Sequence, residues 1–151
     1  MSILASRITA VRSVVDSKKM VLVGGCFDVL HYGHIMFLQK AHAKGEVLVV
    51  ALESDWFIKT KKKRNPIHTQ DMRKKILMAL RSVDAVINLP PMKQDHDYEE
   101  LVWALKPHVI AVTSPDPHMA HKKKFAHAIG ARVVSVIKRI PRYSSTAIIS
   151  R

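Results

Sequence analysis

A tight turn from a strand pattern into a helix pattern constrains the fold of this chain more than any other feature. Residues 20–23 form an apolar run, two glycines follow, and an amphipathic stretch begins at Gly33. A strand that turns directly into a helix gathers free backbone N–H groups and the positive end of the helix dipole at one point. His31 and His34 add two imidazoles to that point. The segment therefore predicts a phosphate cradle, better suited to a triphosphate than to a monophosphate.

Two plainer interpretations of the histidine pair stay open. Histidines on one helical face can bind a metal, but no obvious third ligand lies near them in the sequence. They can also be ordinary residues at the start of a helix, although the glycines before them favour the cradle. We therefore expect no resident metal at this position.

Strand and helix patterns alternate along the chain. Strands are expected at 19–24, 47–52, 85–89, 108–112 and 132–137, and helices at 2–16, 33–44, 69–80, 98–105, 119–129 and from 144 onward. The lysine-rich residues 55–66 are expected to be mainly loop. The nearly continuous Val/Leu run at 47–52 indicates a strand covered on both faces. The alternation predicts an α/β fold with a five-stranded parallel sheet, helices on both faces and right-handed crossovers.

Length and composition predict a single domain. A chain of 151 residues buries a core without disulfides, and no apolar run reaches the roughly 20 residues that span a bilayer. We expect residues 1–17 to be a helical extension packed on a domain of residues 18–151, with a partly ordered extension as the alternative. The lack of a signal-peptide pattern and the single cysteine, Cys26, favour a cytoplasmic location.

The net charge of +13 is the unusual feature of the composition. Basic residues gather at 59–64, 122–124 and 138–142, each in or beside an expected loop after a strand or at the start of a helix. In a parallel α/β sheet this is the edge that binds ligands, so a polyanionic small substrate explains part of the charge. A nucleic-acid-binding surface is the alternative, because basic surfaces gain affinity by releasing counterions from phosphate backbones.

Two motifs carry a resemblance to a known family. Residues 25–34, Gly-Cys-Phe-Asp-Val-Leu-His-Tyr-Gly-His, resemble the G-x-F-D-x-x-H-x-G-H signature of the cytidylyltransferase-like nucleotidyltransferases, and residues 143–149 are similar to the closing S-[ST]-T-x-[IL] motif of that family. The match spans residues 18–151 and implies a Rossmann-like domain. The family includes glycerol-3-phosphate and ethanolamine-phosphate cytidylyltransferases, heptose-1-phosphate adenylyltransferase and archaeal-type FAD synthetase.

The resemblance implies nucleotidyl transfer. In that reaction an acceptor phosphate oxygen attacks the α-phosphorus of a nucleoside triphosphate in line and expels pyrophosphate. By the resemblance, His31 and His34 bind the phosphates and stabilise the negative charge that builds on them, and Gly33 lets the nucleotide lie close to the backbone. Mg²⁺ is expected to bridge the phosphates, with Asp28 and Asp116 as candidates for touching it.

The resemblance also gives catalytic roles to Lys62 and Arg73. Lys62 lies in a match to a mobile basic segment of the family, and Arg73 in a match to its E-x-R-x-x-x-[IL] helix. A solvated charge run and a solvent-facing arginine are the respective alternatives. The residues expected to bind the nucleotide are Gly25, Cys26, Phe27, Asp28, Gly33, Lys61, Lys63, Arg139, Tyr143, Ser144, Ser145 and Thr146.

Several of these residues also have structural interpretations. Asp28 can cap the following turn, and Cys26 can be a small packed residue. Ser145 and Thr146 can serve as helix N-caps, which is compatible with phosphate binding. Trp56 can stack on a base or an acceptor, or it can be a buried aromatic.

The substrates are less well determined than the reaction. The residues of these motifs are most similar to those of the heptose-phosphate adenylyltransferases. In several relatives a Gly-Gly-Asp-Tyr-like segment follows the fourth strand, but this chain has Thr-Ser-Pro-Asp-Pro-His at residues 113–118. We favour ATP over CTP, with a phosphorylated small molecule such as a sugar or polyol phosphate as acceptor. A nucleic-acid-binding protein and a catalytically inactive nucleotide sensor are the alternatives, and the resemblance makes a homodimer possible.

Overall fold

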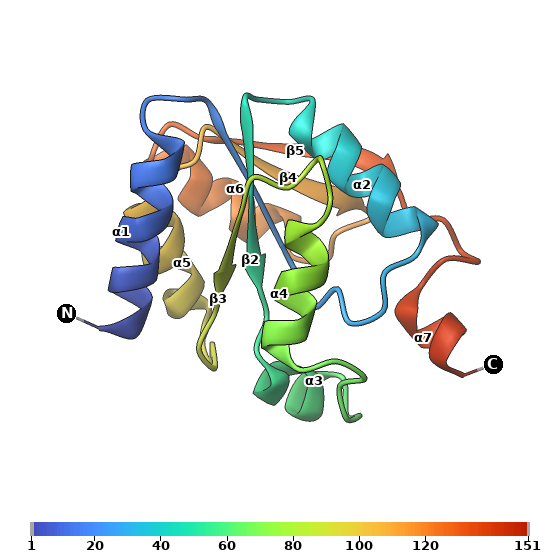
Figure 1. Cartoon of the computed structure of the whole chain (residues 1–151). Coiled ribbons are helices and arrows are strands. Elements are labelled where there is room, and N and C mark those ends of the chain that lie inside the picture. The colour runs from blue at the N-terminus through green and yellow to red at the C-terminus, as the bar shows by residue number, and fades with distance from the viewer. Residues whose placement is uncertain (1, 151) are drawn as a thin grey trace.

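The computed structural model describes residues 2–150 as five strands and seven helices in alternation (Figure 1). The strands are β1 (Met20–Gly25), β2 (Val47–Leu52), β3 (Ala85–Asn88), β4 (Val109–Ser114) and β5 (Arg132–Lys138). The helices are α1 (Ile3–Val15), α2 (Tyr32–His42), α3 (Asp55–Lys61), α4 (Gln70–Met78), α5 (Asp95–Leu105), α6 (Met119–Ala128) and α7 (Ser145–Ile149). None of the helices in this range is long and apolar enough to cross a membrane.

The strands form one parallel sheet in the order β3-β2-β1-β4-β5, which confirms the predicted fold class. The chain moves from β1 to β2 on one side and returns to β4 on the other side of β1. In such sheets ligands bind outside the carboxyl ends of the strands where the order reverses. The carboxyl end of β1, at Gly25, is therefore the place where a site is expected.

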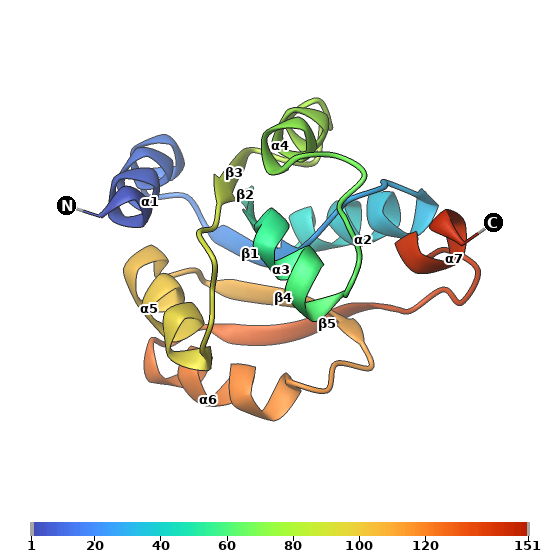
Figure 2. The same cartoon turned by 90° about the horizontal axis from the view of Figure 1, so that it is seen from below.

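Helices cover both faces of the sheet, as Figure 2 shows. Alternation along β1 sends Met20 and Leu22 into a core cluster with side chains of α1, α5 and α6. Val21 and Val23 enter a second cluster with side chains of α2 and α4. All six residues of β2 are buried, as expected for a strand with two covered faces.

Helix α1 packs on the sheet through Ile8, Val11 and Val15. Its arginines fasten it to distant segments, because Arg7 Nη1 donates to the Asn88 carbonyl (2.6 Å) and Arg12 Nη1 donates to the Leu105 carbonyl (3.0 Å). The division into an extension of residues 1–17 and a domain of residues 18–151 stays a prediction.

The segment 55–66 differs from the prediction, because its first half is helix α3 rather than loop. Ser54 caps this helix by accepting a hydrogen bond from the Phe57 N–H (3.2 Å). Asp55 stands in the first turn and Ile58 is fully buried. Capping and one buried anchor are enough to order the helix, although two of its seven residues are lysines and more basic residues follow it.

Candidate active site

The loop between β1 and α2 brings the two histidines together at a helix start. His31 is the N-cap of α2, and its Nδ1 accepts a hydrogen bond from the His34 N–H (3.3 Å). The two imidazole rings stack with centroids 3.8 Å apart, and the Phe27 ring lies 5.1 Å from that of His34. The pair therefore stands at the N-terminus of α2, where the first N–H groups of a helix have no carbonyl partner within the helix.

Burial keeps both imidazoles neutral near pH 7. The pKa of His34 falls to about 4, first because of burial and then because His31 lies beside it, while the Val29 carbonyl opposes the shift. Burial also lowers the pKa of His31. His34 Nδ1 is buried and has no hydrogen-bond partner within residues 2–150. An unsatisfied buried nitrogen of this kind is a candidate for contact with a ligand.

The C-terminal segment lies against the start of α2 (Figures 1 and 2). Ser145 Oγ donates to the Val29 carbonyl (3.2 Å), and Ser144 caps α7 by accepting from the Ala147 N–H (3.1 Å). A Cβ on Gly33 would stand 3.0 Å from the His31 ring and 3.2 Å from the Tyr143 carbonyl oxygen. Glycine at this position therefore allows the two segments to touch.

A shallow hollow of about 350 Å³ opens beside the histidines. The rings of Tyr32 and Tyr143 meet edge to face at 5.6 Å on its wall. Arg142 and Ile148 complete its lining together with His31. Thr146 is exposed at the first turn of α7, close in the chain to the hollow.

Asp28 holds a neighbouring loop rather than facing open space. Its side chain is buried, and its two carboxylate oxygens accept hydrogen bonds from the Arg64 guanidinium and from the backbone N–H groups of Ile67 and His68. Burial alone would raise the pKa of Asp28, but the bonds from Arg64, His68 and Ile67 hold it below its usual value. The carboxylate is thus ionised and fully engaged.

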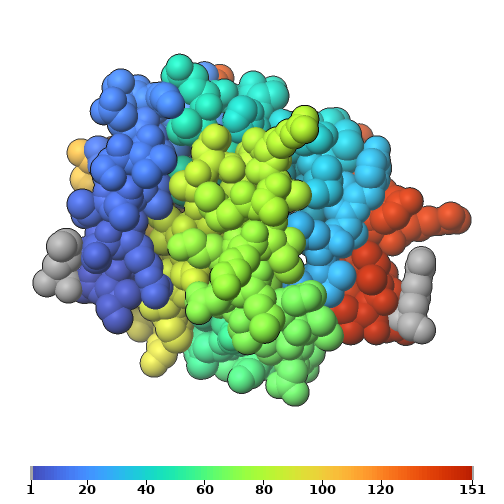
Figure 3. Space-filling model, viewed as in Figure 1, coloured from blue at the N-terminus to red at the C-terminus, as the bar shows by residue number. Residues whose placement is uncertain are grey.

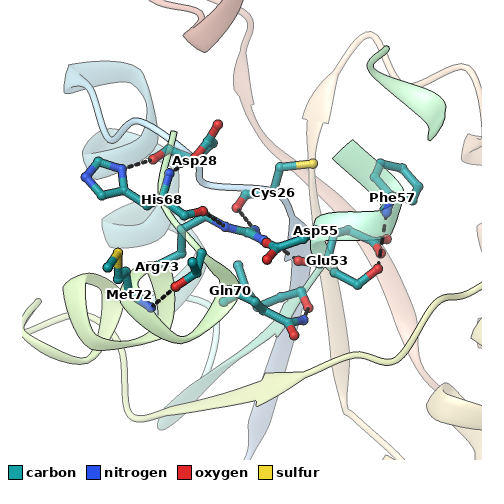
Figure 4. A network of polar contacts seen from close by, with 12 residues as sticks. Cys26, Asp28, Glu53, Asp55, Phe57, His68, Gln70, Met72 and Arg73 are labelled. Atoms are coloured by element: carbon teal, nitrogen blue, oxygen red, sulfur yellow. Dashed lines mark hydrogen bonds and ion pairs between the residues drawn. The ribbon is translucent and has the colours of Figure 1, made fainter. Parts of the chain in front are cut away.

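Arg73 differs most from its predicted position. It was expected to reach toward the phosphates, yet its side chain is 0% exposed. Its guanidinium donates to the carbonyls of Cys26 (2.6 Å), Glu53 (2.9 Å) and His68 (3.1 Å) and pairs with the Asp55 carboxylate (2.7 Å) (Figure 4). The arginine therefore ties the ends of β1 and β2 to α3 and α4.

The basic segment after β2 has one lysine close to the strand ends. Lys61, Lys62 and Lys63 are all exposed where α3 ends, and this part of the chain forms the lower edge of the molecule in Figure 3. Only Lys62 of these three is near enough to lower the pKa values of Cys26 and Glu53 by its charge. Trp56 is half-buried.

Other predicted residues lie at the edges of this region. The Arg139 side chain is exposed just after β5, where its backbone N–H donates to the Ser114 carbonyl (2.8 Å). Asp116 pairs with Lys122 (2.6 Å) and accepts from the His118 N–H (2.8 Å), so it is occupied in fixing the start of α6. Residues 2–150 hold no group of three or more His, Cys, Asp or Glu side chains that could bind a metal ion.

The turn after β1 is built from Gly25, Cys26 and Phe27. A Cβ on Gly25 would stand 2.8 Å from the Phe27 ring, and Phe27 itself has a positive φ of 45°. Burial is the main reason that the pKa of Cys26 rises to about 11, so the thiol is protonated and unreactive near pH 7. The cysteine is a small packed residue of the turn.

Sequence reasoning missed Glu53 and Tyr98. Glu53 directly follows β2 and is 7% exposed, and Tyr98 of α5 donates its hydroxyl to Glu53 Oε1 (2.6 Å). Burial raises the pKa of Glu53 to about 7, although Tyr98, Arg73 and Lys62 all act to lower it. The available signal was an acidic residue at the end of a strictly apolar strand.

Known proteins with similar sequences and structures support one family. FAD synthase of Thermococcus kodakarensis is 37% identical over 139 residues, which cover 89% of this chain and 91% of that protein. Bifunctional protein HldE of Pelobacter propionicus is 34% identical over 136 residues, covering 89% of this chain. The chain spans only 19% to 27% of the length of the bifunctional relatives.

A solved structure shares the fold over most of the chain. The lipopolysaccharide core biosynthesis protein from Thermoplasma volcanium superposes with a TM-score of 0.65 at 26% identity, covering 85% of this chain and 100% of that one. The family described as cytidylyltransferase-like matches residues 22–151, which include the end of β1, both histidines and the terminal serines. This chain therefore belongs to the cytidylyltransferase-like family.

Proposed function

We propose that this chain transfers a nucleotidyl group from a nucleoside triphosphate to a phosphorylated small molecule and releases pyrophosphate. The observation that carries the proposal is the stacked pair His31–His34 at the N-terminus of α2, in contact with the segment that leads into α7. Two neutral imidazoles, free backbone N–H groups and serine hydroxyls converge there. Such donors suit phosphate oxygens.

The proposed step is an in-line displacement at the α-phosphorus. A phosphate oxygen of the acceptor forms the new P–O bond, and the bond from the α-phosphorus to the bridging oxygen of the β-phosphate breaks. The electron pair leaves with pyrophosphate, and no covalent enzyme intermediate is needed. His31 donates a hydrogen bond to a phosphate oxygen, and His34 does so through Nδ1 when the negative charge of the phosphates protonates its ring, so both act on the oxygens whose charge changes most in the transition state.

The remaining residues divide into those that touch phosphates and those that hold the site. Lys62 reaches the phosphates from the end of α3, while Ser144, Ser145 and Thr146 bind the β- and γ-phosphates from the start of α7. Arg73 is a positioning residue, because its guanidinium is occupied by backbone carbonyls and Asp55.

Magnesium is assigned to the substrate rather than to the protein. The carboxylates of Asp28 and Asp116 are both engaged with protein groups and do not fit a metal ligand set. We therefore derive no step from a protein-bound ion, and the nucleotide is expected to enter as its Mg²⁺ complex.

We propose ATP as the nucleotide and a sugar phosphate, a polyol phosphate or FMN as the acceptor. The name of FAD synthase, the relative that matches along most of its length, indicates the joining of AMP to FMN. Sugar and polyol phosphates are proposed because residues 25–31 and 64–67 resemble the corresponding motifs of the heptose-phosphate adenylyltransferases.

The test is pyrophosphate release with Mg²⁺, crossing ATP and CTP with glycerol 3-phosphate, glucose 1-phosphate, FMN and phosphoethanolamine. His34→Ala is the test variant and His127→Ala, an exposed histidine of α6, is its matched control. Release that requires one acceptor and is lost only in His34→Ala supports the proposal. Nucleotide binding without release points to a sensor. Salt-sensitive binding of nucleic acid without nucleotide binding points to the other alternative.

A further inference from the structure

Glu53 presents a buried carboxyl oxygen that nothing in the described chain uses. Its Oε1 accepts the Tyr98 hydroxyl, but its Oε2 is buried without a hydrogen-bond partner within residues 2–150. Leaving such an oxygen unpaired is unfavourable, because it loses its hydration and gains nothing in exchange. Residues that destabilise a fold in this way are often kept for binding or catalysis.

Glu53 lies beside the proposed nucleotide site, but it is not one of the groups that donate hydrogen bonds to the phosphates. Its backbone N–H donates to the Gly25 carbonyl (2.9 Å), so it stands level with the turn after β1. The charges that act on its carboxyl group come from Lys62 and Arg73, and its own charge acts on Cys26. Glu53 therefore lies between the end of β1, Arg73 of α4 and Tyr98 of α5, with the charge of Lys62 nearby.

In-line attack indicates which substrate would meet this carboxyl group. The acceptor and the leaving pyrophosphate must lie on opposite sides of the α-phosphorus. Ser145 of α7 contacts the loop that leads into α2, so with the serines binding the β- and γ-phosphates as proposed above, the pyrophosphate lies on that side of β1. The acceptor then approaches from the β2 side of β1, where Glu53 follows the strand and Lys62 supplies positive charge.

The chemistry of the surroundings selects the kind of donor. The exposed lysines 61–63 attract the acceptor phosphate and disfavour a second cation on the acceptor. A carboxyl oxygen there is best satisfied by an uncharged donor. We propose that Glu53 Oε2 accepts a hydrogen bond from a hydroxyl group of the acceptor, which selects hydroxyl-bearing phosphates over amino-alcohol phosphates. This inference rests on the proposed function.

Kinetics of a paired variant test the assignment. Glu53→Leu combined with Tyr98→Phe removes both hydrogen-bonding partners. No buried polar group then loses its hydrogen-bond partner, so the double variant is expected to fold. Its KM for the acceptor is expected to rise roughly 10- to 100-fold, the effect of one hydrogen bond to a charged group, with an unchanged KM for ATP. His127→Ala, the exposed histidine of α6, is the control and is expected to change the acceptor KM less than threefold.

A deoxy acceptor separates binding from structural support. Removal of the contacting hydroxyl from the acceptor is expected to raise the wild-type KM by a similar factor and to have little further effect in the double variant. Equal effects of the double variant on the acceptor and on ATP would overturn the inference. Preference of the wild-type protein for phosphoethanolamine over every hydroxyl-bearing phosphate would do so as well.

Carbon NMR supplies a readout that does not need turnover. The chain has four glutamates, at positions 46, 53, 99 and 100, so ¹³C-labelled glutamate gives few carboxyl signals, and Glu53→Gln identifies that of Glu53. With a non-hydrolysable ATP analogue present, FMN or glucose 1-phosphate is expected to shift this signal, while inorganic phosphate is not. Transfer activity with an unmoved Glu53 signal contradicts the inference alone. Absence of transfer with every acceptor contradicts the proposed function itself.

Discussion

The imidazole rings of His31 and His34 stack 3.8 Å apart, and burial holds the pKa of the second ring near 4. Two protonated rings at this distance would repel each other strongly. The pair is therefore neutral before the nucleotide binds, and the bound phosphates supply the negative charge that favours protonation and lets His34 Nδ1 donate a hydrogen bond.

Replacement of His34 by alanine is expected to lower kcat/KM for transfer by roughly 10²- to 10³-fold, the usual effect of removing one donor to transition-state charge. The substitution removes a ring whose buried Nδ1 has no hydrogen-bond partner within residues 2–150 and is therefore available to a ligand. Steady-state kinetics check the result against His127→Ala. A loss of less than threefold in His34→Ala would place the reaction elsewhere.

The contribution of His34 to stability is expected to fall as the pH drops from about 6.5 to 4, whereas Glu53, whose pKa of about 7 in the folded protein lies above its usual value, contributes in the opposite direction. His34 is titrated at about 4 in the folded protein and near 6.5 in the unfolded chain, so the unfolded chain binds more protons in this window. The contribution is complete above pH 6.5 and amounts to at most about 3 kcal/mol. Urea unfolding of wild type and of His34→Gln at several pH values measures it as the difference between the two proteins, which should grow in favour of wild type from pH 4 to pH 6.5. Identical slopes for both proteins contradict the assignment.

Arg73→Met is expected to lower the free energy of unfolding by about 3–5 kcal/mol, because it strands a carboxylate and buried carbonyls that the guanidinium satisfies. Chemical denaturation measures the change, with the exposed Arg81→Met as control. A well-folded Arg73→Met protein without activity would instead indicate direct contact with the phosphates.

Asp28→Asn is expected to loosen residues 64–68, which the carboxylate holds through Arg64 and two backbone N–H groups. The expected loss is about 1–3 kcal/mol for charge-assisted bonds to a buried carboxylate. Limited trypsin digestion should cut faster after residues 61–64 in this variant than in wild type. Asp16→Asn, at the end of α1, serves as the comparison. Equal cleavage rates would show that other contacts order the segment.

The sheet could be predicted because its signals are local. Val47–Leu52 is apolar throughout and bounded by polar residues, and the strand occupies the predicted range. A helix was predicted to begin at residue 69, and Thr69 caps α4. Helix α3 was missed because its capping by Ser54 and burial of Ile58 are weak signals among lysines.

The contacts of single side chains could not be predicted in the same way. Arg73 and Asp28 were predicted to lie near phosphates because their motifs resemble those of the family. The atoms that they contact depend on how α3, α4 and the ends of β1 and β2 pack together. Glu53 was overlooked because its pairing with Tyr98 joins residues 45 positions apart. Such pairings depend on tertiary packing rather than on local pattern.

The most direct test follows the α-phosphorus of ATP. With ATP labelled at this phosphorus, Mg²⁺ and the preferred acceptor, wild-type protein is expected to move the label to the acceptor while one pyrophosphate forms for each label transferred. His34→Ala should retain less than about a hundredth of this rate. Label that stays in ATP, label released as free AMP, or an undiminished rate in His34→Ala would contradict the account.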